Sequence, residues 1–163
     1  MKLFKRKDET SSNTIDVFNV TDGIVIPLSD VKDEVFSKEM LGKGVGVIPS
    51  NTTCVYSPVS GNICTVFPTK HAIGIRTIEG VEILIHIGID TVELNGEYFE
   101  CFVKQGQSIL KGDKLCDIDF TGISEKGYDT TIMVIVTNTN EFDEILTDTN
   151  NNDSSEYIIR VLK

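Results

Sequence analysis

The sequence predicts an all-β protein, an antiparallel β-sandwich or barrel with few short helical turns. From Val17 to Val136 the chain passes through short segments rich in Val, Ile, Thr and Phe, which are typical strand residues. Turn pairs such as Asp22-Gly23, Ser60-Gly61 and Asn95-Gly96 separate these segments at short intervals. Helical periodicity is scarce, so no helical layer is expected.

The other elements follow from local signals along the chain. The segments from Asp30 to Met40 and from Asn140 to Leu146 are expected to form one or two helical turns each. An Asn-rich loop precedes a last strand from Tyr157 to Leu162. The phrases Val20-Thr-Asp-Gly-Ile24 and Pro58-Val-Ser-Gly-Asn-Ile63 each put a small-residue turn before a strand, which suggests a faint internal duplication.

Length and composition indicate one soluble globular domain. The chain has 163 residues, of which 40% are hydrophobic and 25% charged. Residues 1–14 are polar and are predicted to form a flexible leader, so that residues 15–163 make up the domain. The leader begins with a basic cluster. We expect this cluster to make at most a weak contact with an anionic membrane. The cluster consists of Lys2, Lys5, Arg6 and Lys7.

Charge and cysteine spacing exclude several classes of function. The formal net charge of -10 argues against nucleic acid as a partner, because phosphate groups would be repelled. No apolar run approaches the ~18 residues of a membrane span, and no secretory signal precedes the domain, so a cytoplasmic location is expected. Cys54, Cys64, Cys101 and Cys116 form no Cys-x-x-Cys pair, which predicts reduced, mostly structural thiols.

The two histidines of the chain, His71 and His86, flank a predicted β-hairpin that turns at or just before Glu79-Gly80. A two-residue Glu79-Gly80 loop would put His86 opposite Ile73, with His71 diagonal to it. A loop one step earlier would oppose the two histidines directly. Both registers put the imidazoles on one face, about 5 to 8 Å apart. An odd-length loop without a bulge would separate them.

The surroundings of this pair bear on its role. On the same face we expect Ile73, Ile75 and Leu84, which would make the setting apolar. A lone histidine on an apolar strand is more often structural than catalytic. Two buried imidazoles both need hydrogen-bond partners, so the pair favours a functional site.

Two neighbouring imidazoles restrict the chemistry. A metal hydrolase needs three protein ligands, and neither HExxH nor His-x-His occurs. The sequence also lacks a nucleophile elbow, a phosphate-binding P-loop and a Rossmann glycine pattern. Without a nucleotide or metal, such a pair can hold a phosphoryl group. One ring nitrogen attacks phosphorus, and the other ring donates a hydrogen bond to the phosphoryl oxygens.

A longer motif surrounds the second histidine. The segment Gly80-Val-Glu-Ile-Leu-Ile-His86-Ile-Gly-Ile-Asp-Thr-Val92 closely resembles the phosphorylation-site signature of enzyme IIA of the glucose family in the bacterial sugar phosphotransferase system. The resemblance extends over roughly Val17 to Phe142. Its further matches lie at residues 33–42, 67–74, 106–113 and 127–131.

This resemblance implies an antiparallel β-sandwich of the duplicated hybrid motif type that needs no cofactor. His86 would accept a phosphoryl group from the histidine-containing carrier protein HPr and pass it to the sugar-transporting IIB/IIC component. His71 would steady the phosphoryl group, and the Thr69 hydroxyl would orient His71. The carbonyl of Gly88 would accept a hydrogen bond from the other ring nitrogen of His86, which fixes the tautomer.

The resemblance also implies a partner-binding face. Asp33 and Asp90 would meet basic side chains, while an apolar depression would contact several partners in turn. Core packing is the alternative for each apolar member, and Phe67 and Leu84 fit either interpretation. Val35-Phe36 and Met40-Leu41 lie in a segment interrupted by charges, which favours a surface patch. The members of the face are Asp33, Val35, Phe36, Met40, Leu41, Phe67, Leu84, Asp90 and Val92.

Three alternatives remain beside the phosphocarrier. A biotinyl- or lipoyl-type carrier would use Lys70, which lacks the usual Met-Lys-Met or Asp-Lys context. A regulatory protein that binds other permeases or metabolic enzymes is compatible with the phosphocarrier role. His71 and His86 are also a candidate Zn²⁺ pair if a partner supplies a carboxylate.

Overall fold

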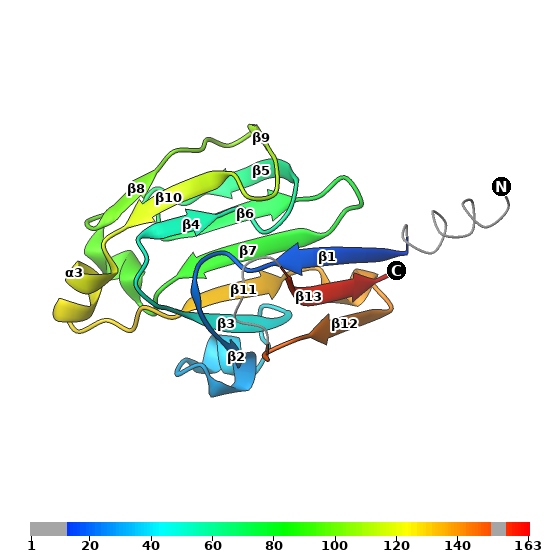
Figure 1. Ribbon diagram of the computed structural model, residues 1–163, viewed down its shortest axis with the longest axis horizontal. Helices are drawn as coiled ribbons and strands as arrows, with labels where there is room; N and C mark the ends of the chain where they lie inside the picture. The colour runs from blue at the N-terminus through cyan, green and yellow to red at the C-terminus, as the bar shows by residue number, and fades with distance from the viewer. Residues whose placement is uncertain (1–12, 151–155) are drawn as a thin grey trace, which may run out of the picture.

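The computed structural model describes residues 13–150 and 156–163 and folds them into one seven-stranded and two three-stranded sheets (Figure 1). Every strand pair among the described residues is antiparallel, as predicted. The large sheet has the order β2 (Gly23–Pro27), β3 (Lys43–Pro49), β11 (Ile132–Val136), β7 (Glu82–Ile87), β6 (Ala72–Arg76), β5 (Gly61–Val66) and β9 (Ser108–Ile109). One small sheet orders β4 (Cys54–Tyr56), β10 (Lys114–Ile118) and β8 (Phe99–Cys101), and the other orders β1 (Thr14–Phe18), β13 (Tyr157–Leu162) and β12 (Glu144–Thr147).

Both small sheets pack on the same face of the large sheet. The main hydrophobic core joins Ile85 of β7 and Val134 of β11 to Leu115 of β10 and Ile159 of β13. This layering of sheet on sheet makes the molecule a β-sandwich and confirms the predicted fold class.

The opposite face of the large sheet carries a second, smaller core. Strand β11 is buried along its whole length, because Ile132, Val134 and Val136 face the main core while Met133 and Ile135 face the second one. The second core is covered by the segment between β2 and β3, through Leu28, Val31 and Phe36. The site described below lies at this second core.

The short helical elements only partly match the expectations. The predicted turn between Asp30 and Met40 is confirmed as helix α2 (Glu34–Ser37), which follows the 3-10 turn η1 (Leu28–Asp30). The turn expected from Asn140 to Leu146 is wrong beyond its start, because η3 (Thr139–Glu141) gives way to strand β12. The remaining turns are η2 (Thr91–Leu94) and α3 (Phe120–Glu125).

The ends of the domain are strands. The predicted last strand matches β13 residue for residue. The predicted leader extends one residue too far, because Thr14 already pairs with Leu162. The rest of the leader up to residue 12 and most of the Asn-rich loop, residues 151–155, lie outside the described residues.

Two glycines explain why the duplicated turn phrases use this residue. A Cβ on Gly23 would lie 2.1 Å from the Ile48 carbonyl oxygen, and one on Gly61 would lie 2.3 Å from the Arg76 carbonyl oxygen. Each glycine therefore lets its strand, β2 or β5, approach the backbone of its neighbour.

Among the described residues, no helix is long and apolar enough to cross a membrane.

Candidate functional site

The β6–β7 hairpin carries the histidines in a register that neither sequence-based alternative predicted. Ala72 pairs with His86, and the backbone N–H of Thr77 donates to the carbonyl of Val81, so that the loop has three residues, 78–80. The predicted even-length loops are therefore wrong. The side chains of Ile73 and Ile75 face the main core rather than the histidines, whereas Leu84 shares the face of His86, as expected.

The two imidazoles meet despite this odd-length loop. His71 precedes the first residue of β6 and ends the turn between β5 and β6, where Lys70 adopts a left-handed conformation with φ +64°. The alternation of a strand does not apply to a turn residue, so the His71 ring points toward His86. The ring centroids lie 4.8 Å apart and the ring planes meet at 81°.

Two phenyl rings extend the pair into a row of four aromatic rings. Phe36 from α2 packs against His86 with centroids 4.9 Å apart, and Phe67 packs against His71 at 5.5 Å. His71 is 3% exposed, while His86 is partly exposed. The site is therefore apolar on both sides and open to solvent at His86.

The backbone fixes the tautomer of His86. Its Nδ1 lies 2.9 Å from the carbonyl oxygen of Gly88. Because a carbonyl only accepts, Nδ1 carries the proton and Nε2 keeps a free lone pair. Gly88 has φ +81°, and a Cβ there would lie 2.4 Å from a methyl carbon of Thr91, so glycine is required at this position.

A threonine hydroxyl orients the other ring. The Oγ1 of Thr69 lies 2.7 Å from Nδ1 of His71, in the turn that leads into β6. A hydroxyl can donate to this nitrogen, and the proton of a neutral His71 then resides on Nε2. The two imidazoles are thereby suited to different roles: His86 presents a lone pair and His71 presents an N–H.

Burial keeps both rings neutral near pH 7. Desolvation, and secondarily the neighbouring His86, lower the pKa of His71 to about 4. Desolvation also lowers the pKa of His86, and the Gly88 carbonyl and the carboxylates of Asp33 and Asp90 oppose this shift. The same carboxylates would stabilise positive charge that develops on His86 during a reaction.

Supporting residues of the site include some that the sequence analysis did not assign. The backbone N–H groups of Gly88 and Ile89 donate to the carbonyls of Thr131 and Asp129. The Asp129 carboxylate in turn accepts from the backbone and hydroxyl of Thr131. These bonds hold the loop whose carbonyl orients His86. Residues 127–131 match the family pattern, but no property of the sequence alone connects them to His86.

All but one of the predicted partner-binding residues are exposed or partly exposed. Val35, Met40, Leu41, Phe67 and Val92 are between 40% and 68% exposed. The exception is a buried residue of the second core beneath the site, so it cannot contact a partner at the surface. Its assignment to an exposed patch was wrong. This residue is Phe36, which is 5% exposed.

The acidic members of the predicted face are held by local backbone geometry. Asp33 caps α2, where its carboxylate accepts from the Val35 N–H. Asp90 is exposed and has φ +61°, directly before η2.

The remaining apolar member of the predicted face, Leu84, is partly buried on the same face of β7 as His86.

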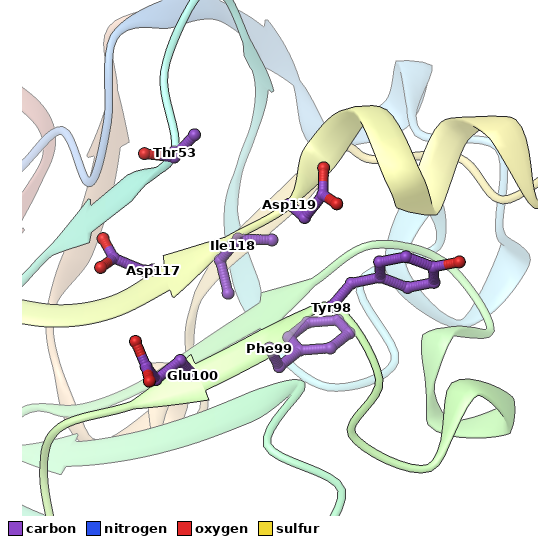
Figure 2. Close-up of a pocket in the computed structure, with 7 residues that line it drawn as sticks. All are labelled: Thr53, Tyr98, Phe99, Glu100, Asp117, Ile118 and Asp119. Carbon is purple, nitrogen blue, oxygen red and sulfur yellow. The ribbon is translucent and has the colours of Figure 1, made fainter.

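A pocket between two strands lies away from the histidines. Its volume is about 520 Å³, and strands β8 and β10 form its walls (Figure 2). It is lined by Thr53, Tyr98, Phe99, Glu100, Asp117, Ile118 and Asp119, none of which is a predicted site residue. The described residues contain no group of three or more His, Cys, Asp or Glu side chains that could hold a metal ion.

Comparison with known families decides the identity of the domain. Residues 15–142 match the family "phosphoenolpyruvate-dependent sugar phosphotransferase system, EIIA 1". The chain belongs to this family. An EIIA domain is a phosphotransferase component of the sugar phosphotransferase system, so the resemblance inferred from the His86 motif is confirmed.

Relatives and a solved structure agree with this membership. The glucose-specific EIIA component of Mycoplasma capricolum is 50% identical over 105 residues, which cover 64% of this chain and 68% of that protein. The structure of glucose permease IIA from M. capricolum superimposes with a TM-score of 0.79 at 37% identity, covering 90% of this chain and 95% of the other.

Longer relatives contain the domain as one part. The glucose-specific EIICBA component of Staphylococcus saprophyticus is 41% identical over 151 residues, which cover 93% of this chain but 22% of that protein. The β-glucoside-specific EIIBCA component of Bacillus subtilis is 48% identical over 120 residues, 74% of this chain and 20% of that protein. This EIIA chain thus spans about a fifth of such relatives.

Proposed function

We propose that this EIIA domain is a phosphocarrier that accepts a phosphoryl group on Nε2 of His86 from HPr. It then passes the group to a sugar-transporting IIB/IIC component. The observation that carries the proposal is the pair of imidazoles with centroids 4.8 Å apart, each bonded through Nδ1 to a group two residues away in the chain. The Nε2 atoms are thereby left for chemistry.

The transfer exchanges one phosphorus–nitrogen bond for another. The Nε2 lone pair of His86 attacks the phosphorus of the donor phosphohistidine, and the donor imidazole leaves with the electrons of the broken bond. The positive charge that forms on the His86 ring strengthens the Nδ1–H bond to Gly88, and the carboxylates of Asp33 and Asp90 stabilise it.

His71 acts on the phosphoryl group rather than on phosphorus. With Thr69 donating to Nδ1, the Nε2–H of His71 donates to a phosphoryl oxygen and stabilises its negative charge. Burial keeps His71 neutral, so it does not act as an acid at neutral pH. The flanking rings of Phe36 and Phe67 limit the approach of water to the labile bond.

The exposed apolar side chains of the predicted partner-binding face are proposed to contact both partners. Val35, Met40, Leu41, Phe67 and Val92 form a surface that a donor and an acceptor use in turn. Flexible methionine suits such shared contacts. The exposed carboxylate of Asp90 would meet basic groups on either partner. Binding to other permeases or metabolic enzymes would use the same surface, and all these encounters are proposed to occur in the cytoplasm.

The test is a reconstituted relay. Labelled phosphoenolpyruvate, enzyme I and HPr are expected to phosphorylate the wild-type protein with an acid-labile, base-stable bond. His86→Ala should accept no phosphate, whereas the matched variant His71→Gln should still accept it, because His86 remains. Stoichiometric phosphorylation of His86→Ala would refute the proposal.

Onward transfer separates the two histidines further. His71→Gln is expected to slow transfer to IIB more than acceptance from HPr, since the departing phosphoryl group needs the oriented N–H donor. Equal loss in both directions would contradict a distinct role for His71. Membrane components for glucose, β-glucoside and glucosamine, taken from the names of the relatives, are the acceptors with which to begin.

Zinc is a second candidate ligand at this site. His86 supplies a free Nε2 lone pair, and His71 would supply one if its proton moved to Nδ1, from which it would be donated to the Thr69 hydroxyl oxygen. A partner carboxylate would be needed to complete a tetrahedral site with water. Calorimetry of partner binding with and without Zn²⁺ tests this. Tighter binding that is lost in His71→Gln supports the proposal, and unchanged affinity refutes it.

A further inference from the structure

Two cysteines that lie far apart in the sequence meet across two strands. Cys101 on β8 pairs directly with Cys116 on β10, and their sulfur atoms lie 3.2 Å apart. The adjoining cross-strand pair, Glu100 and Asp117, is visible on the same two strands in Figure 2. All four cysteines are free thiols, so this pair is a reduced dithiol.

The backbone geometry at this pair suits a disulfide. The next residues along the strands are bonded to each other, with the Phe102 N–H donating to the Leu115 carbonyl, which makes Cys101 and Cys116 a non-hydrogen-bonded pair. The Cα atoms of such pairs are about 4.5 Å apart, within the range of about 4.4 to 6.8 Å found across disulfides. Bond formation therefore requires the sulfur atoms to approach by about 1 Å and leaves the strands paired.

The two thiols differ in their surroundings. Cys116 is fully buried, whereas Cys101 is partly exposed. The hydrogen of the Cys101 thiol points to the Lys70 carbonyl oxygen, 3.6 Å away, so the short contact between the sulfurs is donated by Cys116. This hydrogen bond from Cys116 and the charge of Lys70 lower the pKa of Cys101 against the effect of burial. The hydrogen bond with Cys101 and burial raise the pKa of Cys116.

We propose that Cys101 and Cys116 form a reversible disulfide when hydrogen peroxide oxidises the protein. The Cys101 thiolate attacks one peroxide oxygen, the oxygen–oxygen bond breaks, and protonation of the leaving oxygen releases water and leaves a sulfenic acid. The sulfur of Cys116 then attacks the sulfenic sulfur. The new sulfur–sulfur bond forms as the sulfenic oxygen leaves with the Cys116 proton as a second water. A dithiol reverses the reaction.

The dithiol is connected to the histidine site through Lys70. Lys70 stands between Thr69 and His71 in the turn before β6, and its carbonyl accepts from Cys101. Oxidation removes the thiol hydrogen and draws the Cys101 sulfur toward Cys116, so this turn loses one of its bonds. We therefore expect the disulfide to change the environment of the His71 ring.

The experiment oxidises the full chain with hydrogen peroxide, blocks remaining thiols with an alkylating reagent and measures intact mass. The Cys54→Ser, Cys64→Ser double variant should still form an intramolecular disulfide to completion, and dithiothreitol should reverse it. Cys101→Ser and Cys116→Ser should not form it. In Cys116→Ser a sulfenic acid should be trapped on Cys101 by dimedone; Cys116→Ala provides the same test if serine is not tolerated in the buried position.

The outcomes are distinct. Absence of an intramolecular disulfide in the double variant, or linkage through Cys54 or Cys64 in the wild-type protein, would overturn the redox proposal. The imidazole NMR signals of His71 are expected to move on oxidation and to return on reduction. A disulfide that leaves these signals unchanged would overturn the connection to the site.

Discussion

Acidification is expected to destabilise the protein through His71. Burial, and secondarily His86, lower the pKa of His71 from 6.5 to about 4 in the folded state. Between these values the unfolded chain binds a proton that the folded protein excludes, so stability falls as the pH decreases through this window. Near pH 5 this group contributes a slope of about 1.2 kcal/mol per pH unit, and the loss below its folded pKa is about 3 kcal/mol.

Urea denaturation measured from neutral pH to about pH 4.5 tests this slope in the wild-type protein and in His71→Gln. Acidic residues and His86 add their own pH dependence to both proteins, so the difference between the two curves reports His71. The variant is expected to lose less stability on acidification. A His71 ring that titrates near 6.5 by NMR, or two curves that run parallel, would refute the lowered pKa of His71 in the folded protein.

Three further substitutions test the site from different sides. Thr69→Val should cost about 1–3 kcal/mol of unfolding free energy in urea, because a buried ring nitrogen loses its partner, while Thr69→Ser should retain stability. Gly88→Ala should cost about 1–3 kcal/mol for its positive φ alone, with the contact to Thr91 adding to it; an unchanged melting temperature would contradict this. Met40→Asp should change stability by less than about 0.5 kcal/mol yet raise the KM for HPr, and Ile78→Asp, at a 96% exposed loop position, should change neither.

Strands and turns were predictable because their signals are local. Alternating β-branched segments between glycine turns identify most strands, and the prediction for β13 is correct to the residue. The end of η3 was not predictable, because β12 exists through its pairing with β13 and not through a local pattern. The family motif is also a local signal, because it is a continuous segment around His86.

The register of the histidine hairpin depends on distant residues. Glu79-Gly80 resembles a two-residue turn, but the hydroxyl of Thr77 accepts from the Val81 N–H and closes a three-residue loop. The side chain of Asn138, far along the chain, donates to the Gly80 carbonyl and accepts from the backbone of Glu82. Such tertiary bonds leave no trace in the hairpin sequence, so both predicted registers were wrong even though the pairing of the imidazoles was correct.

The burial of Phe36 and the pairing of Cys101 with Cys116 could not be predicted from the sequence, because both depend on tertiary contacts. Phe36 stands among charged residues, which suggested a surface position, yet α2 turns this one ring inward onto His86. Cys101 and Cys116 share no spacing motif, and only the pairing of β8 with β10 brings them together. The expectation of four mostly structural thiols therefore missed the dithiol.

The histidine pair is organised by its own chain rather than by a partner. Each Nδ1 is bonded to a group two residues away, and the loop behind His86 is tied to Asp129 and Thr131. A phosphocarrier must react with two different proteins, and a ring that each partner had to orient would add an entropic cost to both encounters. With the rings already oriented, the contacts of the exposed apolar residues need only align phosphorus with Nε2. We therefore expect weak, rapidly exchanging complexes to be sufficient both for acceptance from the donor and for transfer to the acceptor.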